Sequence, residues 1–131
     1  MQNMSTGGCL CGGVRFEVRG KIRDVINCHC KICRVFHGDQ VGCTSASVKD
    51  LVFTSERTLK WYHSTDFAKR GFCENCGASM LFWDKNNPEA MGIAIGCMDE
   101  PTGVKVVQHI YVASAGDYYE INDDLPKLAE E

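Results

Sequence analysis

The sequence predicts a single, mainly β domain that is held together by bound metal. Short apolar segments recur roughly every ten residues along its 131 residues, as they do in all-β domains. Thirteen glycines and many polar turn residues separate these segments, and long helical periodicity is absent. Nine cysteines occur, most of them in close groups of the kind that bind metal. We expect one domain over 1–131, with a folded core over about 5–126.

The clearest strand is 14–18, where Val14, Phe16 and Val18 alternate with charged residues. This period of two is typical of a strand with one buried face. Further strands are predicted by β-branched and aromatic segments, in chain order 25–26, 40–44, 51–54, 59–63, 80–83, 91–95, 104–113 and 118–121. Short helical turns are expected at 33–37 and 47–51. The acidic end, 123–131, is expected to be loosely held.

Charge and hydropathy argue against two classes of partner. The formal net charge is −3, and the basic residues are scattered, with only Lys69 and Arg70 adjacent. Phosphate binding needs a basic stripe, so we expect no nucleic acid partner. No apolar run approaches the roughly 20 residues that span a bilayer, so we expect no membrane association. The polar start, 1–8, does not resemble a signal peptide, and we expect a cytoplasmic protein whose thiols stay reduced.

The segment 73–77, Cys-Glu-Asn-Cys-Gly, has the form of a zinc knuckle. Two cysteines three residues apart across a tight turn bring both sulfurs to one ion. Gly77 permits the positive φ that lets backbone N–H groups approach the thiolates. The same motif can be a redox dithiol, but that use requires a βαβ setting that the sequence lacks. We therefore interpret Cys73 and Cys76 as zinc ligands.

Cys9 and Cys11 form a second close pair, followed by two glycines. On an extended segment, residues i and i+2 share a face, so both sulfurs can reach one ion. Two ligands do not hold a structural zinc, and Cys73 and Cys76 would complete a closed four-thiolate site. The alternative is that Cys9 and Cys11 are ordinary buried residues of an edge strand. Their paired placement beside glycines favours metal binding.

The segment 28–33, Cys-His-Cys-Lys-Ile-Cys, is the most informative. Cys28, Cys30 and Cys33 are so close that a single ion can take all three sulfurs. This site is one protein ligand short, and zinc with three protein ligands and an open fourth position is typical of catalytic centres. The sequence therefore predicts two zinc ions per chain, one structural and one catalytic.

A closed second site is the alternative, with Cys43, His29 or His37 as its fourth ligand. Cys43 stands in an apolar, strand-like segment and is therefore expected in the core. His29, between two ligands, either transfers protons near the metal or serves as a structural hydrogen-bonding group. His109 belongs to an alternating apolar strand and is expected to be a buried core histidine.

Five segments carry a family resemblance: G-C-L-C-G-G-V-R-F at 8–16, C-H-C-K-I-C-R at 28–34, R-G-F-C-E-N-C-G at 70–77, H-I-Y at 109–111 and N-D-D-L-P at 122–126. In this order they resemble the glutathione-dependent formaldehyde-activating enzyme family, also called the centromere protein V family. The likeness extends over nearly the whole chain. His37 and Cys97 depart from the family pattern, which bears on the substrate more than on the fold.

The resemblance implies a fold similar to that of the Rab-binding chaperone Mss4, with coiled antiparallel β-sheets around a structural zinc. It implies that the structural zinc is held by Cys9, Cys11, Cys73 and Cys76. It implies that the catalytic zinc is held by Cys28, Cys30 and Cys33, which we take as the catalytic residues. The implied activity is that of a carbon–sulfur lyase, which condenses glutathione reversibly with formaldehyde to S-(hydroxymethyl)glutathione.

The expected partner is thus a small-molecule thiol such as glutathione. Metal coordination lowers a thiol pKa far below its free value of about 8.5, and the resulting thiolate would attack an aldehyde carbon. Three thiolate ligands make zinc a weak Lewis acid, which suits a sulfur ligand better than water activation. Lys31, Arg34 and Arg70 are the cations nearest in sequence to the cysteine groups, although each alone is expected to be solvated surface charge.

Two other functions remain compatible with the sequence. A non-catalytic zinc scaffold that binds a protein partner, as Mss4 does, would have its second site closed by a fourth protein ligand. A thiol redox enzyme, related in fold to methionine sulfoxide reductase B, would use Cys97 as its nucleophile. That class takes two Cys-x-x-Cys pairs for zinc, whereas here only Cys73 and Cys76 form such a pair outside the segment 28–33. The aromatic residues around the knuckle are expected to pack beneath it or to wall a substrate cleft: Trp61, Phe72, Phe82 and Trp83.

Overall fold

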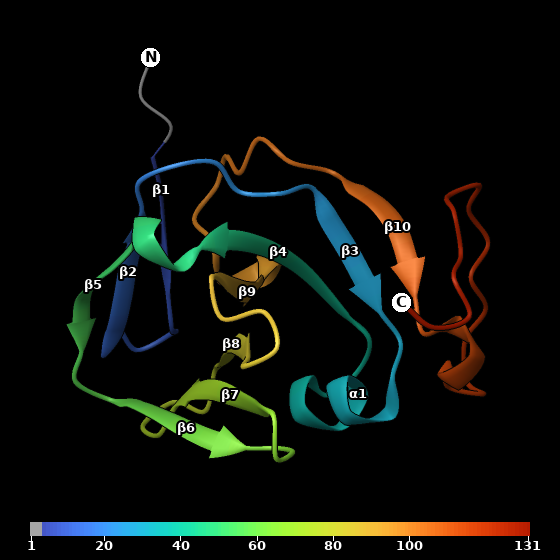
Figure 1. The fold of residues 1–131 in the computed structure, drawn as a ribbon, viewed down its shortest axis with the longest axis horizontal. Helices are drawn as coiled ribbons and strands as arrows, with labels where there is room; N and C mark the ends of the chain where they lie inside the picture. The colour runs from blue at the N-terminus through green and yellow to red at the C-terminus, as the bar shows by residue number, and fades with distance from the viewer. Residues whose placement is uncertain (1–3) are drawn as a thin grey trace.

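A computed structural model describes residues 4–131, and in this part of the chain ten β-strands form two sheets (Figure 1). The smaller sheet has the strand order β1-β2-β5, and the larger has the order β10-β3-β4-β9-β8-β7-β6. Neighbouring strands are antiparallel except β10 and β3, which are parallel. The prediction of a mainly β fold is confirmed, and the architecture is consistent with Mss4-like sheets.

The strands have the following bounds. The smaller sheet consists of β1 (Ser5–Gly8), β2 (Val14–Val18) and β5 (Leu51–Glu56). The larger sheet consists of β3 (Val25–Cys28), β4 (Val41–Ser47), β6 (Leu59–His63), β7 (Ala68–Cys73), β8 (Ser79–Asp84), β9 (Ala90–Ala94) and β10 (Val106–Ile110). One α-helix, α1 (Lys31–His37), follows β3, and short 3-10 helices span Val48–Asp50, Ile95–Cys97 and Val112–Ser114.

The core joins the two sheets. The alternation on β2 places Val14, Phe16 and Val18 on the inner face, where each is at most 1% exposed. They belong to the same buried cluster as Leu81 of β8 and Ile93 of β9. Full burial of a side chain such as Phe or Leu contributes about 1.5–3 kcal/mol. This shared core fixes the smaller sheet against the middle of the larger one.

Two strands and one predicted segment show where sequence patterns fall short. The strand β1 reads Ser-Thr-Gly-Gly and has low β-propensity, and it is a strand because it pairs along its length with β2. The strand β7 was not predicted, because Lys69 and Arg70 interrupt its apolar pattern. The predicted strand at 118–121 is wrong, and that segment is irregular.

The acidic end of the chain lies along β10, as Figure 1 shows. The N–H of His109 donates to the carbonyl of Pro126, and the N–H of Leu128 donates to the carbonyl of His109, each at 2.9 Å. The N–H of Tyr111 donates to the carbonyl of Glu130, also at 2.9 Å. The expectation of a loosely held end is wrong, because backbone pairing with an edge strand does not require apolar side chains.

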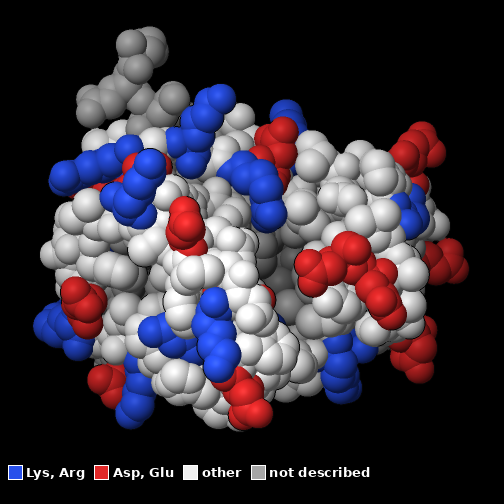
Figure 2. Space-filling view, in the orientation of Figure 1, with Lys and Arg blue, Asp and Glu red and all other residues white. Residues whose placement is uncertain are grey.

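Figure 2 shows acidic and basic side chains interspersed over one face, without a continuous basic stripe in this view. Among residues 4–131, no helix has the length and apolar character that crossing a bilayer would require.

Candidate metal centres

Four sulfurs meet where the turn between β1 and β2 approaches the turn between β7 and β8. The Sγ atoms of Cys9, Cys11, Cys73 and Cys76 all lie within 4.8 Å of one another. The Cys11 sulfur is 3.6 Å from those of Cys9 and Cys73. Zn–S bonds of about 2.3 Å in a tetrahedron place sulfurs about 3.8 Å apart, whereas a disulfide requires about 2.05 Å. This four-cysteine group can hold a metal ion, and its spacing fits zinc.

Hydrogen-bond donors surround the sulfur of Cys73. The backbone N–H groups of Asn75 and Cys76 each donate to it at 3.3 Å, and the Thr58 hydroxyl lies 3.1 Å away. Burial raises the pKa of Cys73, but the hydrogen bonds from Thr58 and the two amides outweigh burial and lower the pKa to about 6. The surroundings of Cys73 therefore favour the thiolate that a metal ion needs.

Tight turns, not strand geometry, bring these four sulfurs together. Gly77 has a φ of 80°, as expected for the knuckle, and its N–H donates to the carbonyl of Cys73 at 2.8 Å. Cys9 and Cys11 lie in the turn after β1, where the Cys9 N–H donates to the carbonyl of Val14 at 3.0 Å. The prediction of an extended segment for this pair is wrong, because the chain reverses direction there.

The second group forms where β3 leads into α1. Cys28 is the last residue of β3, Cys30 is the N-cap of α1 and Cys33 lies in its first turn. Their three sulfurs all lie within 4.8 Å of one another. The N–H of Cys33 donates to the sulfur of Cys30 at 3.3 Å, so the thiol also caps the helix. Three soft sulfur donors at these separations suit zinc.

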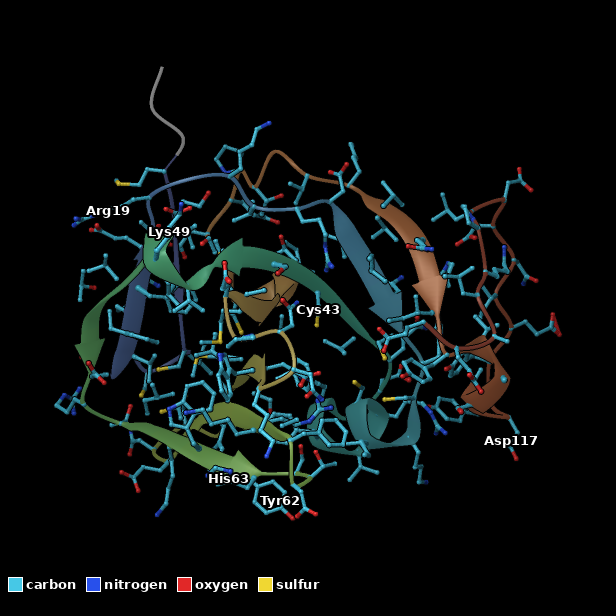
Figure 3. All side chains as sticks on the ribbon, viewed as in Figure 1. Arg19, Cys43, Lys49, Tyr62, His63 and Asp117 are labelled. Carbon is cyan, nitrogen blue, oxygen red and sulfur yellow. The ribbon has the colours of Figure 1, made fainter. Side chains whose placement is uncertain are left out.

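None of the side chains considered as a fourth ligand joins this three-cysteine group within residues 4–131. Cys43 lies on β4, near the centre of the molecule in Figure 3, and His37 ends α1. Both line the cavity beside the three sulfurs but lie outside the group. The two ring nitrogens of His29 are occupied by other partners. The three-cysteine group thus leaves a fourth position without a side-chain ligand from the described chain.

His29 belongs to a buried chain of hydrogen bonds. Its Nδ1 lies 2.8 Å from the hydroxyl of Tyr119, and its Nε2 lies 2.8 Å from Nδ1 of His109. The Nε2 of His109 lies 2.8 Å from a carboxylate oxygen of Asp123. One assignment satisfies every group: the hydroxyl donates to His29, His29 donates to His109, and His109 donates to Asp123.

These hydrogen bonds bear on the two roles considered for His29. The side chain is 0% exposed, and both of its nitrogens are bonded, which favours the structural role over proton transfer to a ligand. His109 is 4% exposed, as expected for a core histidine. Tyr119 and Asp123 were not singled out by sequence reasoning. For Asp123 the available signal was its place in the segment 122–126 that resembles the family.

A cavity of about 650 Å³ opens beside the three-cysteine group. This volume falls within the roughly 300–1,000 Å³ of small-molecule sites. Its wall includes the three cysteines, apolar side chains such as Phe82, Ile110 and Tyr111, the cations Arg23, Lys31 and Arg70, and the carboxylates of Asp84 and Glu131. The face drawn in Figure 2 is hollowed near its centre. Another hollow of about 680 Å³ is shallower and contains none of the cysteines, so we assign no site to it.

The three cations considered from the sequence lie in different settings. Lys31 is exposed at the cavity. Arg34 donates to the carbonyls of His29 and Ser114, so its guanidinium joins two segments that are far apart in sequence. Arg70 is only 6% exposed, which overturns the expectation of solvated surface charge.

Arg70 shapes the electrostatics of the cavity. Its Nη1 donates to the sulfur of Cys33 at 3.6 Å. A hydrogen bond from Cys28, together with the charge of Arg70, holds the pKa of Cys33 at about 5, below that of an ordinary thiol. Burial, aided by the same guanidinium, lowers the pKa of His37 to about 4. The cavity thus favours a thiolate on Cys33 and a neutral imidazole on His37 near pH 7.

Comparisons with known proteins show which proteins this chain is similar to. The sequence model of the glutathione-dependent formaldehyde-activating enzyme family matches residues 4–114. An uncharacterized lyase of Schizosaccharomyces pombe is 33% identical over 76 residues, which make up 58% of this chain and 55% of that protein. The chain therefore spans about half the length of this curated relative. A structural-genomics target from Rhodobacter sphaeroides, known from its crystal structure, is 26% identical, with a TM-score of 0.63 over 78% of this chain and 99% of that one.

Proposed function

The chain belongs to the glutathione-dependent formaldehyde-activating enzyme family, and from this membership and the site we propose that it is a zinc-dependent carbon–sulfur lyase. Its reaction is the making and breaking of thiol–aldehyde adducts, such as S-(hydroxymethyl)glutathione from glutathione and formaldehyde. One observation carries the proposal: three sulfurs converge in the wall of a cavity, with no fourth side-chain ligand from residues 4–131. The naming of a relative as a lyase supports the reaction class.

Two zinc ions would have distinct roles in this enzyme. The four-cysteine group would enclose one ion completely and support the fold. Cys28, Cys30 and Cys33 would hold the other, facing the cavity. When bound there, zinc lowers the pKa of a thiol in its remaining position and stabilises the thiolate.

One part of the cavity wall, formed by apolar side chains and two cations, binds and orients the substrate. Phe82, Ile110 and Tyr111 exclude water from the reacting carbon, while Lys31 and Arg70 supply positive charge that suits an anionic thiol. In the forward direction the thiolate sulfur forms a bond to the aldehyde carbon, and the carbonyl electron pair moves onto oxygen. The proton lost by the thiol ends on that oxygen, so no atom is oxidised or reduced. The lyase direction reverses each of these changes.

The direct test is exchange spectroscopy on a mixture of the zinc-loaded full chain, glutathione and ¹³C-formaldehyde. Magnetisation transfer between free and adduct carbon measures the rate at which the C–S bond forms and breaks. We expect exchange well above the uncatalysed background, and we expect the Cys30→Ser variant to lose the excess. Cys43→Ser is the matched control, because Cys43 lines the same cavity but lies outside the three-cysteine group.

Two results would contradict the proposal. If the wild-type chain with two zinc ions bound exchanged free and adduct carbon only at the uncatalysed rate, the formaldehyde reaction would be ruled out. Equal loss in Cys43→Ser and Cys30→Ser would show that the decrease reflects the cavity in general and not the three-cysteine group.

A further inference from the structure

Arg70 is held rigidly beside the three-cysteine group. It lies on β7 and is 6% exposed. Its Nη1 donates to the sulfur of Cys33 at 3.6 Å, and its Nε donates to the hydroxyl of Ser64 at 3.4 Å. Its Cζ lies 4.8 Å from the ring centroid of Phe82 and 5.7 Å from that of Phe36. Hydrogen bonds at two edges and an aromatic ring on its face fix the plane of the guanidinium.

The positive charge of Arg70 has no carboxylate partner. Within residues 4–131, every carboxylate that forms an ion pair does so with a basic residue other than Arg70. Burial of an unpaired guanidinium is strongly unfavourable, so a neighbouring negative charge is required. The group that faces Nη1 is the sulfur of Cys33, a member of the three-cysteine group.

The position of Arg70 changes the net charge of the three-cysteine centre. Three thiolates and one Zn²⁺ carry a net charge of −1, and the guanidinium brings the centre to neutrality. A thiolate that binds as a fourth sulfur would then bring the centre to −1. Without Arg70 the same step would end at −2 inside a partly enclosed cavity, where like charges repel more strongly than in water.

Arg70 also has donors available for a ligand. Its Nη2 makes no hydrogen bond with residues 4–131. In that part of the chain, every side-chain nitrogen or oxygen that is fully enclosed has a hydrogen-bond partner, so Nη2 is not fully enclosed. Nη2 therefore reaches open space, and the space that Arg70 lines is the cavity beside the three sulfurs.

We propose that Arg70 balances the charge of the three-cysteine centre and thereby makes it selective for an anionic sulfur ligand over a neutral one. The inference rests on the proposed function, because it concerns how a thiolate enters the fourth position. It assigns Arg70 a positioning role, through Cys33, in both metal retention and ligand choice.

The test compares Arg70→Met, which removes the charge, with Arg70→Lys, which keeps it. Arg23→Met is the matched control, because Arg23 lines the same cavity but donates to the backbone carbonyls of Asp24 and Cys43. The first measurement is zinc release from the full chain to a chromogenic chelator. The second is the absorption of the cobalt-substituted chain during titration with 2-mercaptoethanol, which binds as a thiolate, and separately with imidazole, which binds as a neutral ligand.

We expect Arg70→Met to weaken zinc binding at the three-cysteine group by about 10- to 100-fold, the usual effect of removing a group that supports a metal ligand. The zinc of the four-cysteine group should be retained as in the wild type, which also shows that the variant is folded. Thiolate binding to cobalt should weaken by a similar factor, while imidazole binding changes little. Arg70→Lys should retain most of the thiolate binding, and Arg23→Met should match the wild type.

Wild-type zinc retention and thiolate binding in Arg70→Met would overturn the proposal. If Arg70→Met loses both zinc ions, Arg70→Lys decides: preference for thiolate over imidazole supports a charge effect, and its loss overturns one. A wild-type chain that binds no thiol would refute the proposed function. Zinc release by the wild type and Arg70→Met would then still decide whether Arg70 balances the centre.

Discussion

Nε2 of His29 lies 2.8 Å from Nδ1 of His109, although the two histidines are 80 residues apart in sequence. His29 stands between Cys28 and Cys30, so this bond ties the loop that carries two candidate ligands to β10. The bond from His109 to Asp123 extends the connection to the end of the chain. The position of the three-cysteine group therefore depends on long-range hydrogen bonds as well as on its own local turn.

Replacement of His109 by phenylalanine should destabilise the chain. The substitution keeps a planar ring of similar size but leaves the N–H of His29 buried without an acceptor, at a cost of about 1–3 kcal/mol. Urea unfolding of the zinc-saturated chain measures this change. His63→Phe is the control, because His63 is exposed on β6 and its replacement should change the free energy of unfolding by less than about 0.5 kcal/mol. Equal stabilities for the two variants would show that the buried bond contributes nothing.

Gly77→Ala should weaken the zinc knuckle through backbone strain alone. A Cβ at this position meets no atom within 4 Å, but the φ of 80° is unfavourable for alanine by about 1–2 kcal/mol. Gly96→Ala provides the control, since its Cβ is equally unobstructed and its φ lies outside the left-handed region. Chelator-induced release from the four-cysteine group should accelerate only in Gly77→Ala. Identical release rates would disprove the strain argument.

The two cysteine groups should respond differently to loss of one ligand. Cys30→Ser should retain one zinc ion per chain and a native circular dichroism spectrum, because the three-cysteine group lies at the wall of a cavity. Cys73→Ser should lose the fold with its metal, since Cys73 is 0% exposed, lies in the core cluster, and structural zinc supplies folding free energy. Metal analysis and circular dichroism of both variants measure the outcomes. A folded Cys73→Ser chain would contradict the structural role.

His37 should remain neutral between pH 5 and 8. Burial, with a contribution from Arg70, lowers its pKa to about 4, compared with about 6.5 in an unfolded chain. The unfolded chain therefore binds the proton more readily, and stability is lost as the pH falls from about 6.5 toward 4. The imidazole NMR signals of His37 report this directly and should show no midpoint above pH 5. His37→Gln should flatten the decline in unfolding free energy between pH 6.5 and 5.

The sequence predicted most of the strands of both sheets because these strands carry their own side-chain patterns. The alternation at 14–18 and the aromatic segment at 59–63 match β2 and β6 residue for residue. The structures of β1 and of the end of the chain were not predicted. β1 is ordered by backbone pairing with β2, and the end of the chain by backbone pairing with β10, and neither depends on its own side-chain pattern.

The candidate site likewise has features that the sequence predicted and features that it did not. The three-cysteine group is local in sequence, so its spacing alone predicted that its sulfurs lie together, whereas the four-cysteine group was predicted by combining two close pairs of cysteines. The burial of Arg70 and its contact with Cys33 arise from the packing of β7 against α1, two elements 37 residues apart at the point of contact. The bonds of His29 to Tyr119 and His109 likewise depend on a chain path that no local pattern encodes.

The hydrogen bonds around His29 also set an order of events during translation. His29 is synthesised 80 residues before His109 and 90 residues before Tyr119, the two residues that it bonds. Cys11 and Cys73 are separated by only 62 residues, and both are synthesised before His109. Because a nascent chain emerges from its N-terminus, the four-cysteine group can close first, while the other three thiols wait for the final strand. During that interval the three thiols have not reached their final arrangement, so they are more open to oxidation or to capture of the wrong ion than in the folded chain.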